Sequence, residues 1–189
     1  MRENFYELIE ANPVIAAVKD DKGLETLQAC EDIRVVFTLY GDVCNIGRIV
    51  EKIKEAGKIA IVHMDLVEGL SGKESTVDFI HQHTKADGII STKPALIKRG
   101  KELGLYTILR IFILDSMAFE NIRKQMSVAK PDALEILPGL MPKIIKRVCK
   151  MARVPVIAGG LVETKEQVIS LLSAGAHGIS TSREALWTL

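Results

Sequence analysis

Residues 154–182 read VPVIAGGLVETKEQVISLLSAGAHGISTS, and this stretch contains one complete unit of the pattern that decides the fold. The apolar, β-branched run Val154–Ala158 predicts a strand. The sequence Thr164-x-x-Gln167 then predicts a capping box at the start of an amphipathic helix. Gly175 ends that helix, and the run His177–Thr181 predicts a second strand. The stretch is therefore a strand–helix–strand unit.

The same unit recurs along the whole chain. The predicted strands are Pro13–Val18, Arg34–Tyr40, Lys58–Met64, Asp87–Thr92, Tyr106–Leu114, Asp132–Leu137, Val154–Ala158 and His177–Thr181. Helical patterns lie between most of them, and eight units of about 24 residues each are typical of a (β/α)8 barrel. An open, doubly wound sheet is the alternative, but it would normally carry a nucleotide-binding glycine loop after its first strand. This chain has Lys19-Asp-Asp-Lys-Gly23 there instead, so we predict a compact, TIM-barrel-like α/β domain over residues 1–189.

Local signals mark several helix starts. Ser71-x-x-Glu74 predicts a capping box, and Pro94 predicts the first turn of the following helix. Asp115 is expected to cap the helix after the fifth strand. These signals agree with the spacing of the strands.

The composition excludes several classes of protein. The chain has 189 residues, of which 48% are hydrophobic and 26% charged, with a net charge of +1. This is ordinary globular usage, and the longest apolar runs are too short to span a bilayer. The N-terminus lacks the apolar stretch of a signal peptide, so a cytoplasmic location without membrane contact is expected.

The cysteines and histidines give no reason to expect a metal or a cofactor. Cys30, Cys44 and Cys149 form no C-x-x-C motif and fit reduced thiols. No histidine–carboxylate cluster has metal-ligand spacing. No Ser-His-Asp or Cys-His arrangement is recognisable either, so no catalytic residue is assigned.

The sharpest local signal is a phosphate site after the seventh and eighth strands. Gly159 and Gly160 end the seventh strand and allow close approach of the backbone to a ligand. Ser180, Thr181 and Ser182 end the eighth strand and offer hydroxyls and amides at the start of an expected last helix. In barrels these two loops often bind phosphate. The alternative is that the glycines form a simple turn and the hydroxyl residues a helix cap.

Strand alternation places a set of charged side chains at the barrel mouth. Arg110 and Glu135 should point inward from neighbouring strands and form a buried pair. His63 is expected to be a hydrogen-bonded core residue. The charged side chains expected near the active end of the barrel are Lys19, Asp65, Lys93, Arg110 and Glu135. Such a set indicates ligand binding or catalysis, although a purely structural ion-pair network is the alternative.

Five segments together resemble one known family. They are His63-Met-Asp-Leu-Val-Glu-Gly-Leu, Ser91-Thr-Lys-Pro, Leu134-Glu-Ile-Leu-Pro-Gly139, Ile157-Ala-Gly-Gly-Leu and Ser180-Thr-Ser182. Their order is similar to that in the glycerol uptake operon antiterminator regulatory proteins, and the likeness extends from Asn12 to Trp187. The resemblance implies a barrel-like fold, a response to glycerol 3-phosphate and binding of leader mRNA. It also implies a regulator rather than an enzyme.

A basic stripe offers a candidate RNA surface. No acid occurs between Ile136 and Val162, but five bases do: Lys143, Lys146, Arg147, Lys150 and Arg153. The first four follow helical spacing on one face, and basic stripes gain affinity for nucleic acid through counterion release. A solvated helix face is the alternative, since no RNA-recognition motif or aromatic platform is present.

Two functions therefore compete. The first is an antiterminator that senses glycerol 3-phosphate and binds leader mRNA, with assembly into a homo-oligomer left open. The second is a barrel enzyme that acts on a small phosphate ester, such as an aldolase, an epimerase or a prenyl transferase. An enzyme needs a catalytic lysine or carboxylate pair around the reacting carbon, whereas a regulator needs a pocket and a surface for its partner.

Overall fold

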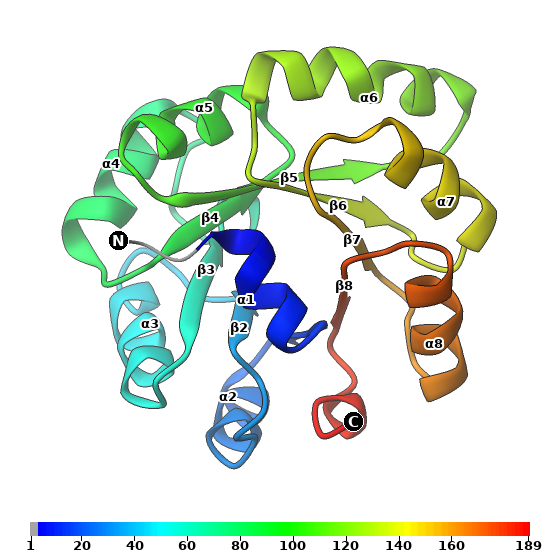
Figure 1. Ribbon diagram of the computed structural model, residues 1–189. Helices are drawn as coiled ribbons and strands as arrows, with labels where there is room; N and C mark the ends of the chain where they lie inside the picture. The colour runs from blue at the N-terminus through cyan, green and yellow to red at the C-terminus, as the bar shows by residue number, and fades with distance from the viewer. Residues whose placement is uncertain (1–3) are drawn as a thin grey trace.

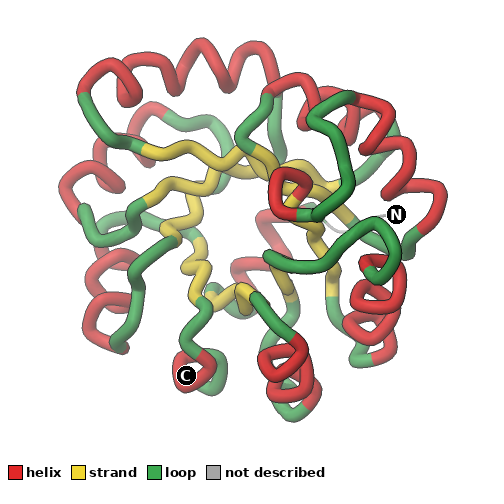
Figure 2. Tube along the Cα trace, turned by 180° about the vertical axis from the view of Figure 1, so that it is seen from behind, coloured by secondary structure: helices red, strands yellow, loops and turns green. Residues whose placement is uncertain are grey.

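The computed structural model describes residues 4–189 and contains a closed barrel of eight parallel strands in the order β1 to β8 (Figures 1 and 2). The strands are β1 Val14–Val18, β2 Val35–Thr38, β3 Ile59–His63, β4 Gly88–Ser91, β5 Tyr106–Phe112, β6 Ala133–Leu137, β7 Val156–Gly159 and β8 Gly178–Thr181. Seven of the predicted ranges contain the corresponding strand entirely, and β7 extends one residue beyond its predicted range, to Gly159. The (β/α)8 barrel is thus confirmed.

Helices surround the barrel, as Figure 2 shows. They are α1 Phe5–Ala11, α2 Asp21–Gln28, α3 Ile46–Glu55, α4 Glu74–His83, α5 Pro94–Glu102, α6 Ser116–Ala129, α7 Pro142–Met151 and α8 Lys165–Ser173. Two short 3-10 turns, η1 Met64–Leu66 and η2 Glu184–Leu186, complete the elements. Among the described helices, none is both long and apolar enough to cross a membrane.

Most of the predicted helix starts are confirmed. Thr164 and Gln167 form the reciprocal capping box of α8, and Asp115 accepts a hydrogen bond from the Ala118 amide at 2.8 Å. The capping box predicted at Ser71 is wrong, because α4 begins at Glu74 with Lys73 as its N-cap residue. The first turn of α4 therefore has no side-chain cap.

Side chains alternate between the barrel interior and the helix layer as the sequence predicts. Leu109, Ile111 and Leu134 lie in a core cluster between strands and helices. A separate cluster, which includes Ile15 and Phe37, fills the barrel interior. Residues that alternate with the outer set on β3, β5 and β6 consequently face inward. This places polar side chains inside the barrel, towards the C-terminal ends of the strands.

Helix α1, which the sequence analysis did not identify, closes the N-terminal end of the barrel (Figure 1). Its Phe5, Leu8 and Ile9 are buried in the interior cluster. The Phe5 ring packs against Tyr106 with ring centroids 5.5 Å apart. Large buried aromatic side chains of this kind stabilise a fold by about 3–5 kcal/mol relative to alanine. The interior is sealed at this end, so a ligand reaches it from the C-terminal end of the strands.

Candidate functional site

A pocket of about 210 Å³ opens where β7 and β8 end. Its lining residues are Lys19, Gly160, Leu161, Val162, Glu163, Ser180, Thr181, Ser182 and Arg183. Four of the five predicted phosphate residues thus meet at one hollow, and Lys19 joins them from the end of β1. The pocket is smaller than those that bind drug-sized molecules, and it suits a small polar ligand.

Gly159 is the predicted phosphate residue that does not line this pocket. A Cβ on Gly159 would lie 2.6 Å from Oε1 of Glu135, so the glycine makes room for that carboxylate. Its neighbour Gly160 has φ +76°, a left-handed conformation that favours glycine, and it does line the pocket. The two glycines therefore serve different purposes.

Leu161 continues the unusual backbone on the pocket rim. It has φ +62° although it is not a glycine, and its side chain is 68% exposed. Non-glycine residues in this region cost free energy and cluster at ligand sites. The strained backbone lies directly beside the hollow.

The hydroxyl residues after β8 also differ in their tasks. Thr181 donates its hydroxyl to the Val162 carbonyl at 2.7 Å and accepts from the Arg183 amide at 3.1 Å. The Thr181 carbonyl accepts a hydrogen bond from the Trp187 indole at 2.9 Å. Within the described chain, the hydroxyls of Ser180 and Ser182 have no such partner, so they remain available to a ligand.

The expectation of a helix after Ser182 is wrong, because only the short turn η2 follows β8. No helix after β8 therefore adds its macrodipole to this pocket. Two cations, Lys19 and Arg183, supply positive charge instead. Arg183 also pairs with Glu163 across the rim at 3.3 Å, with both side chains more than half exposed. Sequence reasoning missed Arg183, although it follows the Ser-Thr-Ser run directly.

The predicted pair of Arg110 and Glu135 is confirmed. Their residues are opposite each other on β5 and β6, and Arg110 Nε lies 2.5 Å from Glu135 Oε2. The second carboxylate oxygen, Oε1, is buried and has no hydrogen-bond partner among the described residues. A buried carboxylate oxygen that lacks a partner is costly, and it therefore indicates a place for a further donor.

His63 lies inside the barrel on β3, but the expectation that it is hydrogen-bonded is wrong. Both ring nitrogens are buried without a partner in the described chain. Burial, followed by the positive charge of Arg110, lowers the pKa of His63 to about 4. The imidazole is therefore neutral at physiological pH and offers one donor and one acceptor. It belongs with Glu135 to a set of unsatisfied polar groups within the barrel.

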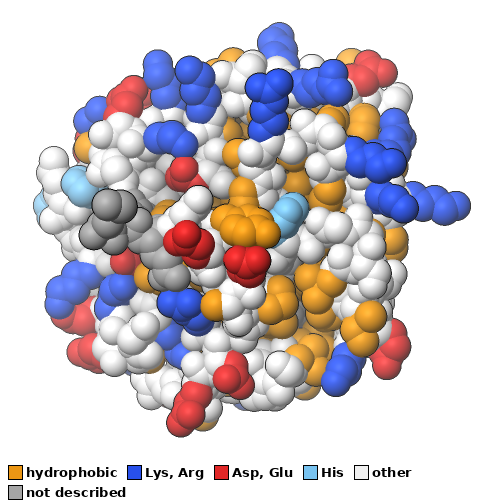
Figure 3. Space-filling model, viewed as in Figure 1, with side chains coloured by type: hydrophobic (Ala, Val, Ile, Leu, Met, Phe, Trp, Pro, Cys, Tyr) orange, Lys and Arg blue, Asp and Glu red, His pale blue; other side chains and the backbone are white. Residues whose placement is uncertain are grey.

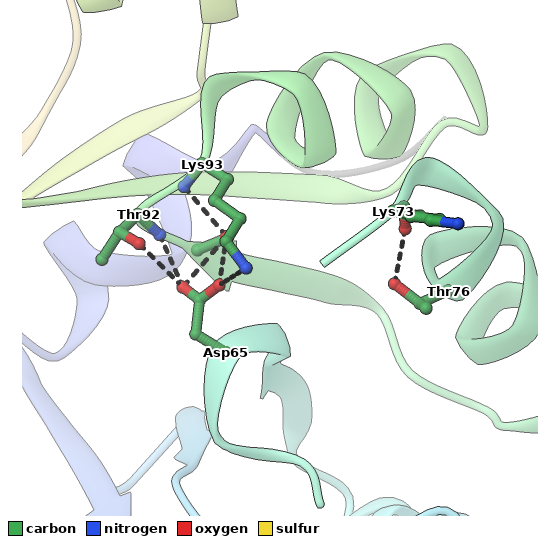
Figure 4. A network of polar contacts seen from close by, with 6 residues as sticks. Asp65, Lys73, Thr76, Thr92 and Lys93 are labelled. Carbon is green, nitrogen blue, oxygen red and sulfur yellow. Dashed lines mark hydrogen bonds and ion pairs between the residues drawn. The ribbon is translucent and has the colours of Figure 1, made fainter. Parts of the chain in front are cut away.

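Asp65 and Lys93 lie in a network that joins the ends of β3 and β4 (Figure 4). Asp65 accepts from the Thr92 amide at 2.7 Å and from the Ser91 hydroxyl at 3.0 Å. Lys93 Nζ lies 3.5 Å from Asp65 Oδ1. Partial burial acts to raise the pKa of Asp65, but these hydrogen bonds outweigh it and hold the pKa below its usual value. The carboxylate thus fixes the turn before α5.

The predicted RNA stripe is divided in the structure. Lys143, Lys146 and Lys150 are exposed along α7. Arg147, on the same face, stacks over the Phe119 ring of α6 at 4.2 Å from its centroid. Arg153 follows α7 and lines a different groove, near the N-terminal end of the barrel.

Within residues 4–189, no group of three or more histidine, cysteine, aspartate or glutamate side chains is placed to hold a metal ion. At the ends of β7 and β8 the fold gathers polar groups in the small pocket, and further polar groups face the barrel interior. Together they define a (β/α)8 barrel with an anion-suited pocket at the C-terminal end of its last two strands.

Comparison with known proteins identifies the family. The chain belongs to the glycerol-3-phosphate responsive antiterminator family, whose model matches residues 14–187. It is 46% identical over 182 residues to an uncharacterised protein of Escherichia coli (strain K12), YgcP, with 96% of this chain and 95% of that protein covered.

Two solved structures are also similar. One is the glycerol uptake operon antiterminator regulatory protein of Listeria monocytogenes, with 31% identity, a TM-score of 0.86, and coverage of 93% of this chain and 95% of that chain. The other is a glycerol uptake operon antiterminator-related protein of Thermotoga maritima, with 36% identity, a TM-score of 0.82, and coverage of 93% and 98%. An aldolase with 14% identity and a TM-score of 0.71 shares the fold alone.

Proposed function

We propose that this protein is a ligand-gated regulator that senses glycerol 3-phosphate and binds leader mRNA, and so prevents premature termination of transcripts for glycerol utilisation. The observation that carries the proposal is the pocket at the ends of β7 and β8, in a chain that belongs to this family. Such a regulator acts in the cytoplasm, where transcripts are made.

The chemistry of the pocket supports a phosphate ligand. The free hydroxyls of Ser180 and Ser182, the backbone at Gly160 and the cations Lys19 and Arg183 suit a dianion. The exposed Glu163 is the one acidic side chain among the lining residues, and its pairing with Arg183 leaves Lys19 to meet the ligand. We assign the phosphate of glycerol 3-phosphate to this pocket.

The unsatisfied carboxylate in the barrel supports a place for the glycerol end. Gly159 lies directly over Glu135 Oε1 and pairs with Ser180 on β8. The free carboxylate oxygen and the phosphate pocket are therefore separated by one strand, which is a short reach for a three-carbon ligand. A hydroxyl donated to Oε1 would satisfy a buried acceptor, which favours glycerol 3-phosphate over inorganic phosphate.

The positions of Asp65 and Lys93 argue for a binding protein rather than an enzyme. The Asp65 oxygens are occupied by Ser91, Thr92 and Lys93. A Schiff-base mechanism would need a free lysine at the barrel mouth, whereas Lys93 is held 3.5 Å from the Asp65 carboxylate on the β4–α5 turn. The effector is bound without a cofactor in this proposal.

A barrel enzyme for a small phosphate ester is the second candidate. The observation that favours it is the neutral, unpartnered imidazole of His63 in the same barrel interior as the buried Glu135 carboxylate, because such groups serve in proton transfer. Incubation with glycerol 3-phosphate followed by NMR detects turnover. A product that disappears in His63→Leu would support the enzyme.

The proposed function is tested by a gel shift with leader transcripts of glycerol-utilisation genes, with and without glycerol 3-phosphate. We expect a retarded band, and we expect the affinity of the protein for the RNA to rise with glycerol 3-phosphate and not with glycerol. RNA binding that is indifferent to the ligand would remove the sensor from the proposal. Linkage requires that the RNA tighten ligand binding by the same factor, and calorimetry measures this independently.

A further inference from the structure

A second and larger hollow lies at the other end of the barrel from the phosphate pocket. It is a groove of about 750 Å³ between the C-terminal ends of α5, α6 and α7. Lys101, Arg123, Lys130 and Arg153 line it together with Met126 and Met151. Figure 3 shows basic side chains gathered over these helices on the face that carries α1, with apolar surface between them.

The groove has a strong excess of positive charge. Lys101 pairs with Asp132 at 2.8 Å. Arg123, Lys130 and Arg153 have no acidic partner in the described part of the chain, and none of the residues that line the groove is acidic. Cations gathered in a concavity with low-dielectric walls focus their field and attract a polyanion.

Lys130 has a backbone conformation that reinforces this interpretation. It caps α6 with φ 47° and ψ 52°, in the left-handed region where glycine or asparagine is usual. Its amide donates to the Met126 carbonyl at 2.8 Å, as a helix-ending residue should. The backbone would be better served by glycine, so the long basic side chain that extends from this position carries a cost that a charged partner explains.

We propose that this groove, formed by Lys101, Arg123, Lys130 and Arg153 over Met126 and Met151, binds single-stranded RNA. The proposal rests on the proposed function and names the surface that the RNA occupies. The cations meet backbone phosphates, while the methionine side chains form an apolar floor for unstacked bases. A duplex offers its bases only within the stack, so the apolar floor favours a single strand.

The same charges disfavour a second copy of this chain as the occupant. In a two-fold dimer whose axis passes through the groove, each groove would face an identical groove. Arg123 and Arg153 would then approach the same cations of the partner subunit without compensating acids. Charge complementarity therefore selects a polyanion.

The stripe on α7 provides a matched control. Lys143 and Lys146 are exposed on α7 and do not line the groove. Two double variants each remove two positive charges. The groove pair is Arg123→Gln with Arg153→Gln, and the stripe pair is Lys143→Gln with Lys146→Gln. The two double variants therefore have the same net charge as each other, two units below the wild type, and differ only in where the charge is removed.

The experiment measures binding of a fluorescein-labelled, mixed-sequence 20-nucleotide RNA by anisotropy at several salt concentrations, with and without glycerol 3-phosphate. We expect the groove pair to weaken binding at least tenfold, while the stripe pair changes it by less than threefold. Loss of two phosphate contacts should also reduce the slope of log K against log salt by about 1.4. A duplex of the same length should bind less tightly than the single strand.

Lys130→Gly separates binding from folding. Glycine suits the left-handed backbone, so this variant should melt at or above the wild-type temperature and still bind RNA more weakly. Two results together would overturn the groove assignment but leave RNA binding intact. Lys130→Gly would keep full RNA affinity, and the groove pair would bind RNA no more weakly than the stripe pair does. A groove pair that converts a dimer to a monomer and keeps RNA affinity would identify a self-association surface instead.

The two levels of the proposal fail differently. If the wild-type protein binds neither this RNA nor leader transcripts, with or without glycerol 3-phosphate, the proposed function itself fails and the groove assignment fails with it. If the wild type binds and the stripe pair alone loses affinity, only the groove assignment is wrong.

Discussion

Glu135 on β6 fills the space that a side chain at Gly159 on β7 would occupy. A Cβ at Gly159 would approach Oε1 of Glu135 to 2.6 Å, while Oε2 of the same carboxylate holds Arg110. The glycine is thus required by a buried ion pair of the barrel interior. Its neighbour Gly160 lines the pocket, so two adjacent residues contact the interior pair and the pocket.

This relationship predicts a stability cost for Gly159→Ala. The added methyl group must displace Glu135 and disturb its pairing with Arg110, and overpacking of this kind costs about 1–3 kcal/mol. Urea unfolding measures it. Gly47→Ala is the matched control, because the nearest atom to a Cβ there, the His83 carbonyl oxygen, lies at an ordinary 3.4 Å. Alanine should stabilise that site in α3 by about 0.5–1 kcal/mol. Equal effects at the two sites would contradict the steric argument.

Glu135→Gln tests the buried pair itself. The substitution leaves the Arg110 guanidinium buried without a counter-charge, and the expected cost is roughly 3–5 kcal/mol in the free energy of unfolding. A double substitution, Arg110→Met with Glu135→Leu, removes both charges and should recover most of that loss. If Glu135→Gln changes ligand affinity alone, the carboxylate serves the ligand rather than the fold. If it changes neither, both roles are refuted.

Glycerol 3-phosphate should stabilise the wild-type fold by about 2.7 kcal/mol at 100 times its dissociation constant. Glycerol lacks the dianion and should do far less. Ser182→Ala and Lys19→Met should reduce the ligand-induced shift in melting temperature without lowering the melting temperature of the free protein, since both residues are exposed. An identical shift in melting temperature with glycerol and with glycerol 3-phosphate would show that this pocket does not bind the phosphate.

Thr181→Val should behave in the opposite way to Ser182→Ala. The Thr181 hydroxyl is buried and bonds the Val162 carbonyl and the Arg183 amide. Its removal leaves those groups unpaired, with an expected cost of about 1–3 kcal/mol in stability. Thermal unfolding of the free protein distinguishes the two variants. A Thr181→Val protein with wild-type stability would show that the hydroxyl is free for the ligand.

His63 should make stability depend on pH between about 4 and 6.5. The folded pKa is about 4 and the ordinary value is 6.5, so the unfolded chain binds more protons in this window. Stability is therefore fully present above pH 6.5 and is lost as the pH falls towards 4, by about 3 kcal/mol in total. Denaturant unfolding across this range measures the slope of the free energy of unfolding against pH. His63→Leu should flatten it, whereas the exposed-site change His81→Gln should leave the slope in place.

The strand–helix repeat and the inward positions of Arg110, Glu135 and His63 followed from the sequence alone. Both depend on local periodicity, because a strand turns its side chains alternately to two faces and a barrel has only an inside and an outside. The capping residues Thr164 and Asp115 were equally predictable, since a cap acts on amides within three residues of it. Pairing of Arg110 with Glu135 also followed, because consecutive strands of the repeat are neighbours.

Contacts between distant segments needed the tertiary structure. Helix α1 had no strand before it to mark it as part of the repeat, and only closure of the barrel gave Phe5 a place to be buried. The glycine at 159 looked like part of a phosphate loop until the position of Glu135 showed what occupies its space. Similarly, the lack of a partner for His63 depends on every strand around the barrel interior.

The basic groove illustrates the same division. Lys101 lies near the end of α5, Arg123 lies within α6 and Arg153 follows α7, so these residues share no sequence pattern. The stripe on α7 has helical spacing, which is visible in the sequence itself. Sequence determined what each segment of this protein becomes, because local propensity and periodicity act over a few residues. Only the tertiary structure decided which charges line one groove. Closure of the barrel brings segments from α5, α6 and α7 together, and no local interaction along the chain depends on the distances between them.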